Sequence, residues 1–168
     1  MSRLQQSAQS AAVCGWLRPR LGVGLILAFA PLPDEVILWP LLESIAAQGR
    51  LALPRVDGSL LTLHRVPHLT SLRAGPFRLQ EPGPGAVVVP PADVAVALVP
   101  GLAFTRAGAR LGRGKGFYDR LLPLFPATTK RIGVCYACQL VDSLPLDDHD
   151  MPVDEVVPVW DGATLAAG

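Results

Sequence analysis

Uninterrupted apolar runs predict the strands of this chain. Residues 22–29, 94–99 and 132–136 are apolar at nearly every position, and residues 153–159 add a last strand. Strands that are apolar on both faces are typical of a parallel sheet with helices covering both sides. We therefore expect these four segments to form the parallel part of a central sheet.

Helical spacing of apolar residues predicts three helices between these strands. Residues 2–18 form an amphipathic pattern. Its apolar positions are Leu4, Ala8, Ala11, Ala12 and Trp16. A second helix is expected to start at Pro33, and a third covers residues 117–125. Pro123 must end or kink the third helix, because proline lacks the backbone N–H that the helix needs.

Turn-forming residues mark the segments that remain. The pair Asp57-Gly58 predicts a hairpin between a short strand at 51–53 and a second strand at 60–64. Residues 67–91 are rich in proline and glycine and are expected to form a surface excursion that is mostly loop.

The order of these elements indicates the class of fold. Strands that alternate with helices require crossover connections, which place strands in parallel and helices on both faces of the sheet. We expect a three-layer α/β/α architecture with a mainly parallel central sheet. A length of 168 residues fits one domain, residues 1–168, and we expect a monomer.

Charge and hydropathy exclude several classes of protein. The net charge is +1 and only 17% of residues are charged, so no broad basic surface for nucleic acid exists. The apolar run at 21–30 is much shorter than the roughly 20 residues of a membrane span. Because Pro31 and Asp34 follow it directly, it also lacks the flanks of a secretory signal. We expect a protein without a membrane or nucleic-acid partner.

Three cysteines give weak information about chemistry. Cys135 and Cys138 form a C-x-x-C pair, which is found in zinc and redox sites, but neither a second pair nor clustered histidines accompany it. Buried, reduced thiols are the simpler interpretation, and they favour a cytoplasmic protein.

The strongest candidate for binding chemistry is a glycine-rich loop between the strand at 94–99 and the helix at 117–125. Its sequence is Arg110, Leu111, Gly112, Arg113, Gly114, Lys115, Gly116, Phe117 and Tyr118. Glycine lets a ligand approach the backbone, and successive N–H groups can surround an anion. The three cations suit phosphate oxygens. The loop is neither a Walker A nor a G-x-G-x-x-G motif.

Residues 99–120 as a whole resemble the signature of the 5-formyltetrahydrofolate cyclo-ligase family, also called methenyltetrahydrofolate synthetase. That signature reads approximately P-G-x-x-F-D-x-x-G-x-R-L-G-x-G-x-G-Y-Y-D. The matching positions are Pro100, Gly101, Phe104, Gly108, Arg110, Leu111, Gly112, Gly114, Gly116, Tyr118 and Asp119.

Two further segments extend the resemblance to residues 20–158. Residues 31–56 resemble an early block in which a glutamate is followed by a helix and a strand ending in Pro-Arg. The matching residues are Glu35, Pro54 and Arg55. Residues 144–157 resemble a closing block with an acidic pair and a final strand. The resemblance implies the fold called NagB/RpiA/CoA transferase-like.

The resemblance also implies an activity. It is the ATP-dependent cyclisation of 5-formyltetrahydrofolate, with or without a polyglutamate tail, to 5,10-methenyltetrahydrofolate, with release of ADP and phosphate. Transfer of the γ-phosphoryl to the formyl oxygen makes that oxygen a good leaving group, so that N10 can attack the formyl carbon. Such transfer depends on positioning and charge neutralisation. By position, loop 110–118 binds ATP, and Arg113 and Lys115 are the catalytic cations.

The remaining roles are likewise implied by position in the family. Glu35 and Phe117 contact the folate, and Asp119 and Asp150 hold Mg²⁺. The residues themselves leave other interpretations open. Glu35 could instead be a charge in the first turn of a helix. Phe117 could pack in the core, and Asp119 could form an ion pair with a cation of the loop. His149 suits a surface position or a base.

Departures from the family pattern define the alternatives. Thr105 and Ala95 stand where the family has aspartate, and Phe117 where tyrosine is usual. Residues 2–18 contain no basic K-x-x-L-R motif. One alternative is therefore a non-catalytic nucleotide- or folate-binding module of the same fold. An unrelated phosphate-binding protein, for phosphosugars or an RNA backbone, is the other, with RNA least supported because aromatic residues do not interleave the basic ones.

Overall fold

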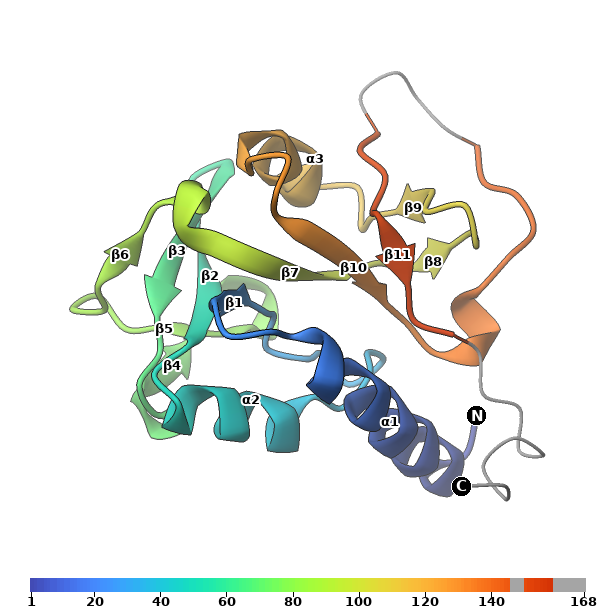
Figure 1. The fold of residues 1–168 in the computed structure, drawn as a ribbon, viewed down its shortest axis with the longest axis horizontal. Helices are drawn as coiled ribbons and strands as arrows, with labels where there is room; N and C mark the ends of the chain where they lie inside the picture. Colours follow the sequence, from blue (N-terminus) through green and yellow to red (C-terminus); the bar gives the residue numbers. More distant parts are fainter. Residues whose placement is uncertain (146–149, 159–168) are drawn as a thin grey trace.

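A seven-stranded sheet forms the centre of the computed structural model, which describes residues 1–145 and 150–158 (Figure 1). The strand order is β11-β10-β7-β1-β2-β3-β6. The bounds are β1 Leu25–Leu27, β2 Leu51–Asp57, β3 Leu60–Arg65, β6 Val88–Val89, β7 Val94–Pro100, β10 Lys130–Val134 and β11 Glu155–Val156. All neighbours from β11 to β2 pair in parallel, whereas β2 with β3 and β3 with β6 pair antiparallel.

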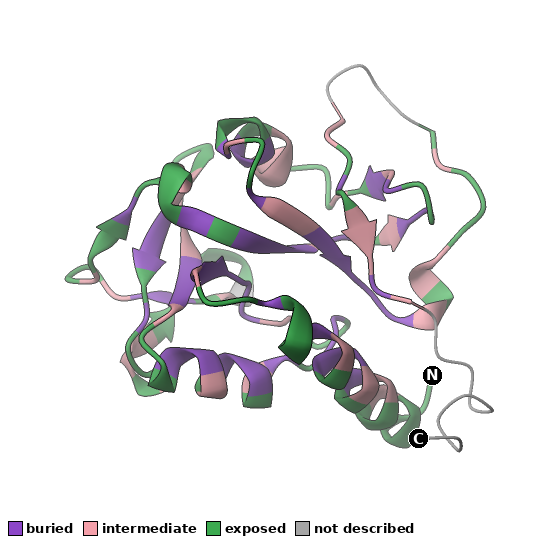
Figure 2. Cartoon of the chain, viewed as in Figure 1, coloured by how far each residue is buried: buried purple, intermediate pink, exposed green. Residues whose placement is uncertain are grey.

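The four predicted apolar runs each overlap one parallel strand, namely β1, β7, β10 and β11, and β2 adds a fifth parallel strand that was not predicted as one. Ile26 and Leu27 of β1, Ala97 and Leu98 of β7, and Ile132 of β10 are all completely buried. Figure 2 shows this buried material running through the middle of the sheet. Apolar side chains on both faces leave water only when helices cover the sheet on each side, so the pattern and the layers are physically linked.

Three α-helices supply those layers. They are α1 Arg3–Leu17, α2 Trp39–Ala47 and α3 Phe117–Leu121, and α3 continues into a 3₁₀ turn, η5 Leu122–Leu124, at Pro123. In Figure 1, α1 and α2 lie below the sheet and α3 lies above it. The α/β class and the mainly parallel sheet are therefore confirmed, while the finer likeness to the NagB/RpiA group stays a prediction. No helix in the described part of the chain is both long and apolar enough to cross a membrane.

Helix α1 exists as predicted, and Trp16 of its apolar pattern packs against the core, but the fully buried positions are others. A capping box between Ser2 and Gln5 starts the helix. The residues that it buries are Ser10, Val13, Cys14 and Leu17. Leu4, an apolar position of the predicted pattern, is 84% exposed. Alanine side chains are too small to show which face of a helix is buried. A pattern of apolar residues also cannot predict that a serine lies in the core.

Helix α2 begins at Trp39 instead of Pro33, so Glu35 lies in a turn and not in a first helical turn. The hairpin at Asp57-Gly58 is confirmed, although β2 continues through Pro54. Since β1 has ended before that point, the missing N–H of Pro54 removes no sheet hydrogen bond.

The excursion after β3 contains more structure than its composition predicts. Its elements are η2 Leu69–Ser71, β4 Leu72–Ala74, η3 Pro76–Arg78, β5 Gln80–Pro82 and η4 Pro91–Asp93. Strands β4 and β5 pair as a small antiparallel sheet of their own. A second small sheet, β8 Ala103–Phe104 with β9 Arg110–Leu111, forms within the glycine-rich region. Short turns η1 Arg18–Arg20 and η6 Ala137–Gln139 complete the chain. His149, Val159 and the small polar tail that follows lie outside the described residues.

Close packing around Phe104 leaves no room for a side chain at Gly133. Phe104 is completely buried, and a Cβ added to Gly133 on β10 would lie 2.6 Å from its ring. We expect Gly133→Ala to lower the free energy of unfolding by about 1–3 kcal/mol through overpacking.

Gly15→Ala on the exposed side of α1 provides the matched control, because nothing lies within 4 Å of a Cβ there. It should raise the free energy of unfolding by up to about 1 kcal/mol, since alanine is the better helix former. Urea unfolding followed by circular dichroism measures both changes, and equal midpoints for the two variants would contradict the packing argument.

Candidate active site

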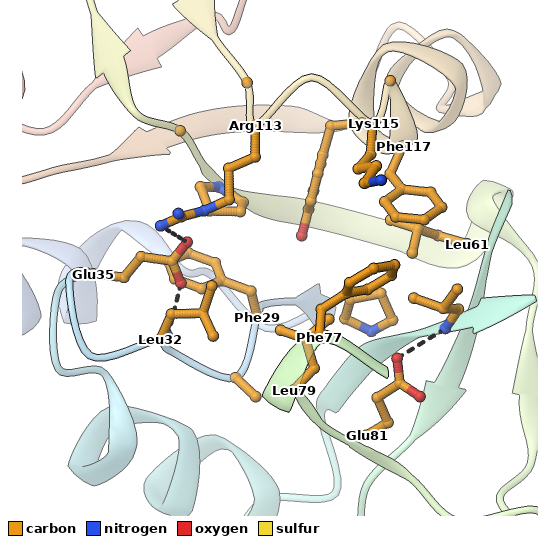
Figure 3. Close-up of a pocket in the computed structure, with 18 of the residues that line it drawn as sticks. Phe29, Leu32, Glu35, Leu61, Phe77, Leu79, Glu81, Arg113, Lys115 and Phe117 are labelled. Carbon is orange, nitrogen blue, oxygen red and sulfur yellow. Dashed lines mark hydrogen bonds and ion pairs between the residues drawn. The ribbon is translucent and has the colours of Figure 1, made fainter. Parts of the chain in front are cut away.

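A pocket opens where the parallel strands β1 and β7 end, and it gathers residues from five separate segments (Figure 3). The ends of the two strands contribute Phe29, Ala30, Pro100 and Gly101. Glu35 comes from the turn before α2, and the glycine-rich loop closes the opposite side. Ligands of α/β sheets bind at this carboxyl edge, so the position agrees with a binding site.

Most of the predicted site residues meet in this pocket. Those that line it are Glu35, Arg110, Gly112, Arg113, Lys115, Gly116, Phe117, Tyr118 and Asp119. Leu111, Gly114 and Asp150 do not line it. Leu111 lies on β9 and is 41% exposed, whereas Asp150 follows a gap in the described chain and is half-buried.

The backbone of the loop explains its glycines. Gly114 and Gly116 have left-handed φ angles of 76° and 66°, which side chains rarely tolerate. A Cβ on Gly112 would lie 2.9 Å from the Arg110 guanidinium. Helix α3 has only five residues, so the positive character of the loop comes from its cations and amides more than from a helix dipole.

Arg110 is buried and supports the loop from within. It is 5% exposed, and its Nη2 forms a short ion pair with Oδ1 of Asp119. Its Nη1 also donates to the Pro100 carbonyl at 3.4 Å. The ion-pair interpretation of Asp119 is therefore realised in this structure. Among the described residues, no three Asp, Glu, His or Cys side chains are close enough together to hold a metal by themselves.

Arg113 joins the loop to the opposite wall of the pocket. Its Nη2 lies 2.7 Å from Oδ2 of Asp34 and 3.4 Å from Oε1 of Glu35. The second oxygen of Glu35 accepts a hydrogen bond from the Leu32 N–H at 2.9 Å. Burial raises the pKa of the Glu35 carboxyl above its ordinary value, and the Leu32 hydrogen bond and the Arg113 charge only partly oppose this effect.

Lys115 and Tyr118 bring a cation and a hydroxyl to the pocket lining. Lys115 lies 5.4 Å from the centre of the Phe77 ring and pairs with no carboxylate among the described residues. The Tyr118 hydroxyl is buried without a hydrogen-bond partner in the described structure. Burial raises the pKa of that hydroxyl, so it stays protonated and can donate. An orphaned donor and an unpaired cation both fit an anionic, polar ligand.

One wall of the pocket was missed by sequence reasoning. The segment predicted as a surface excursion contributes Phe77, Leu79, Gln80 and Glu81. Phe77 is 58% exposed and has a positive φ of 58°, which is rare for an aromatic residue. Glu81 is buried and accepts the Val56 N–H at 3.1 Å. The sequence offered only one indication of this wall, the apolar residues Phe77 and Leu79 two positions apart between Pro76 and Pro82. The pairing of β4 with β5 could not be predicted, because it depends on tertiary contacts.

Other candidate groups have structural roles. His64 is 1% exposed and lies between the Thr62 hydroxyl at 2.9 Å and the Ala86 carbonyl at 3.0 Å. Cys135 and Cys138 are both free thiols, and Cys135 is buried. Burial, with Cys138 nearby, raises the pKa of the Cys135 thiol to about 12, so it is protonated at neutral pH and a poor nucleophile.

Comparisons with known proteins identify the family. The model of the 5-formyltetrahydrofolate cyclo-ligase family matches residues 23–159. The Mycolicibacterium smegmatis 5-formyltetrahydrofolate cyclo-ligase is 35% identical over 162 residues, which cover 90% of this chain and 82% of the relative. The Escherichia coli 5-formyltetrahydrofolate cyclo-ligase is 32% identical, with 94% and 92% covered.

A solved structure agrees with these sequences. The 5,10-methenyltetrahydrofolate synthetase of Aquifex aeolicus superposes with a TM-score of 0.82 at 36% identity, covering 93% of this chain and 80% of that one. The sequence matches and the shared fold extend over the strands, the pocket and the glycine-rich loop described above. The chain therefore belongs to the 5-formyltetrahydrofolate cyclo-ligase family.

Proposed function

We propose that this protein is a 5-formyltetrahydrofolate cyclo-ligase. It uses ATP to close 5-formyltetrahydrofolate to 5,10-methenyltetrahydrofolate, releasing ADP and phosphate. One observation carries the proposal: in a member of this family, the cationic loop 110–118 and the carboxylate of Glu35 line opposite sides of one pocket. Such a pocket can hold a polyanion and a polar ring system next to each other.

The loop is the proposed site for the triphosphate of ATP. Arg113 offers planar, bidentate donors, and Lys115 offers a compact charge without a carboxylate partner in the described structure. Gly112, Gly114 and Gly116 carry no side chains that would keep a ligand away from the backbone amides beside these cations, and Gly114 has nothing within 4 Å of an added Cβ. These groups would stabilise the charge that develops on phosphate oxygens during transfer, and they are already in place before it.

Asp119 and Asp150 are the proposed contacts of Mg²⁺. Asp119 lies in the pocket lining beside the loop, and this position supports a role in binding Mg²⁺. In nucleotide sites Mg²⁺ commonly takes only one or two carboxylates and completes its shell with phosphates and water. A site without a complete protein cage therefore fits a Mg²⁺ ion that enters together with ATP.

The folate is proposed to lie against Glu35 and Phe117. The apolar wall made by residues such as Phe29 and Leu61 suits the flat faces of a pterin ring. The Glu35 carboxylate can accept N–H groups from the edge of that ring, and the Tyr118 hydroxyl, which has no hydrogen-bond partner among the described residues, is a donor in the same pocket lining. When ATP is bound, its γ-phosphoryl activates the formyl oxygen for loss as phosphate. The chain's own contribution is to hold the two ligands in contact and to keep water out.

A non-catalytic module of the same fold remains the alternative function, and turnover by the purified protein decides between the two. We further propose a cytoplasmic monomer without a nucleic-acid partner. Free thiols at Cys14, Cys135 and Cys138 support the cytoplasmic compartment, and a net charge of +1 supports the absence of a nucleic-acid partner.

Lys115→Ala tests the triphosphate site. Removal of a charged contact to phosphate should raise the KM for ATP by about 10- to 100-fold, because such a contact contributes about 1.5–3 kcal/mol. The near-ultraviolet absorbance of the methenyl product gives the rate. Lys130→Ala is the matched control, since Lys130 pairs with Glu155 at 2.5 Å and does not line the pocket. Equal ATP kinetics for the two variants would refute the assignment.

Glu35→Gln tests the folate site. The substitution keeps the shape and removes the charge, so the KM for 5-formyltetrahydrofolate should rise about tenfold while the KM for ATP changes by less than about twofold. Glu43→Gln on the exposed side of α2 serves as the control for a neutral glutamine and should behave as the wild type. An effect of Glu35→Gln that is confined to ATP would show that the two ligand positions have been exchanged.

A further inference from the structure

The turn that carries Glu35 is held by two buried hydroxyls from distant parts of the chain. Residues 36–38 belong to neither a helix nor a strand, so their backbone groups need other partners. The Glu35 carbonyl accepts a hydrogen bond from the Tyr136 hydroxyl at 2.9 Å. The Ile37 N–H donates to the Ser10 hydroxyl at 2.9 Å.

The two hydroxyls also bind each other, and their protons fix the direction of the chain of bonds. Ser10 Oγ and Tyr136 Oη lie 3.1 Å apart, with the residues 4% and 2% exposed. Each hydroxyl has one proton. Because Tyr136 uses its proton on the Glu35 carbonyl, Ser10 must donate to Tyr136. The order is therefore Ile37 N–H to Ser10, Ser10 to Tyr136, and Tyr136 to the Glu35 carbonyl.

Helix α1 adds further contacts to the same turn. The Cys14 thiol, one turn after Ser10, lies 3.7 Å from the Ile37 carbonyl. Both backbone groups of Ile37 are thus bound by α1. Glu35 itself accepts the Leu32 N–H at 2.9 Å, which fixes its side chain relative to its own backbone. The carboxylate therefore has a fixed position only while this backbone is fixed.

Tyr136 is anchored to the sheet and to a second wall of the pocket. It lies two residues after the end of β10, and its N–H donates to Oε1 of Gln139 at 2.8 Å. The amide nitrogen of Gln139 donates to the Gly101 carbonyl at 3.1 Å, and Gly101 lines the pocket. Ser10 and Tyr136 do not line it. They can affect a ligand only through the residues that they hold.

We propose that Ser10 and Tyr136 are positioning residues that fix the Glu35 carboxylate for the folate substrate. The proposal rests on the proposed function, because it assumes that Glu35 meets the folate. A displacement of about 1 Å at a ligand-binding group is enough to weaken productive binding strongly. Loss of either hydroxyl breaks the same chain of bonds and leaves a buried carbonyl or N–H without its partner.

Tyr136→Phe and Ser10→Ala test the proposal in the full-length protein. Each should raise the KM for 5-formyltetrahydrofolate about tenfold, while the KM for ATP changes by less than about twofold. The double variant should resemble the single ones, because both act through one chain of bonds. If Tyr136→Phe does not fold, Ser10→Ala carries the same comparison.

Thr129→Val separates positioning from general stability. Thr129 is 2% exposed, and its hydroxyl donates to the Val94 carbonyl at 2.7 Å, away from the pocket lining. It should lower the urea midpoint as the other two variants do, yet leave both KM values unchanged. Equal changes in both KM values across all three variants would mean that the hydroxyls act through stability alone.

The outcomes also separate this inference from the proposed function. A wild-type protein that neither turns over nor binds 5-formyltetrahydrofolate in calorimetry overturns the proposed function. Wild-type turnover together with an unchanged folate KM in folded Tyr136→Phe and Ser10→Ala overturns only the positioning role.

Discussion

The buried guanidinium of Arg110 is the interaction on which the candidate site depends. It passes beneath Gly112, pairs with Asp119 of α3 and reaches the carbonyl of Pro100 at the end of β7. One side chain thus links the end of strand β7 to helix α3 across the base of the loop. A buried charge that loses its partner is strongly destabilising, so the pair holds the loop in one conformation. The exposed cations of the loop can then be presented to a ligand without a large ordering cost.

The two sides of the pocket have opposite charge and meet at Arg113. The loop brings cations, and the turn before α2 brings Asp34 and Glu35. That turn is not a regular element, so its geometry depends on α1 through Ser10 and on the segment after β10 through Tyr136. Helix α1 contributes no residue to the pocket lining, yet it takes part in shaping the pocket. In this fold the binding surface is assembled from loops, and precision comes from the packed elements behind them.

Several expectations failed for a common physical reason. Leu4 is exposed and Ser10 is buried, although hydrophobicity alone assigns them the other way round. Serine is stable in the core only because Ile37 and Tyr136 satisfy its hydroxyl, and these partners are distant in sequence. Phe77 entered the pocket wall for the same reason, since the pairing of β4 with β5 positions it. Long-range hydrogen bonds are not encoded in any local pattern.

What the sequence determined by itself was the class of fold and the chemistry of the loop. Apolar runs specify buried parallel strands, because only a covered sheet removes both of their faces from water. The alternation of glycines and cations at 112–116 specifies a turn with accessible backbone amides and positive side chains, whatever its position in the fold. Only the tertiary structure decided that Arg110 supports the loop while Lys115 stays unpaired among the described residues, and that Glu35 lies across from them. Whether a charged side chain is buried or paired depends on residues that are distant in the sequence. The sequence around that side chain therefore does not predict its partner.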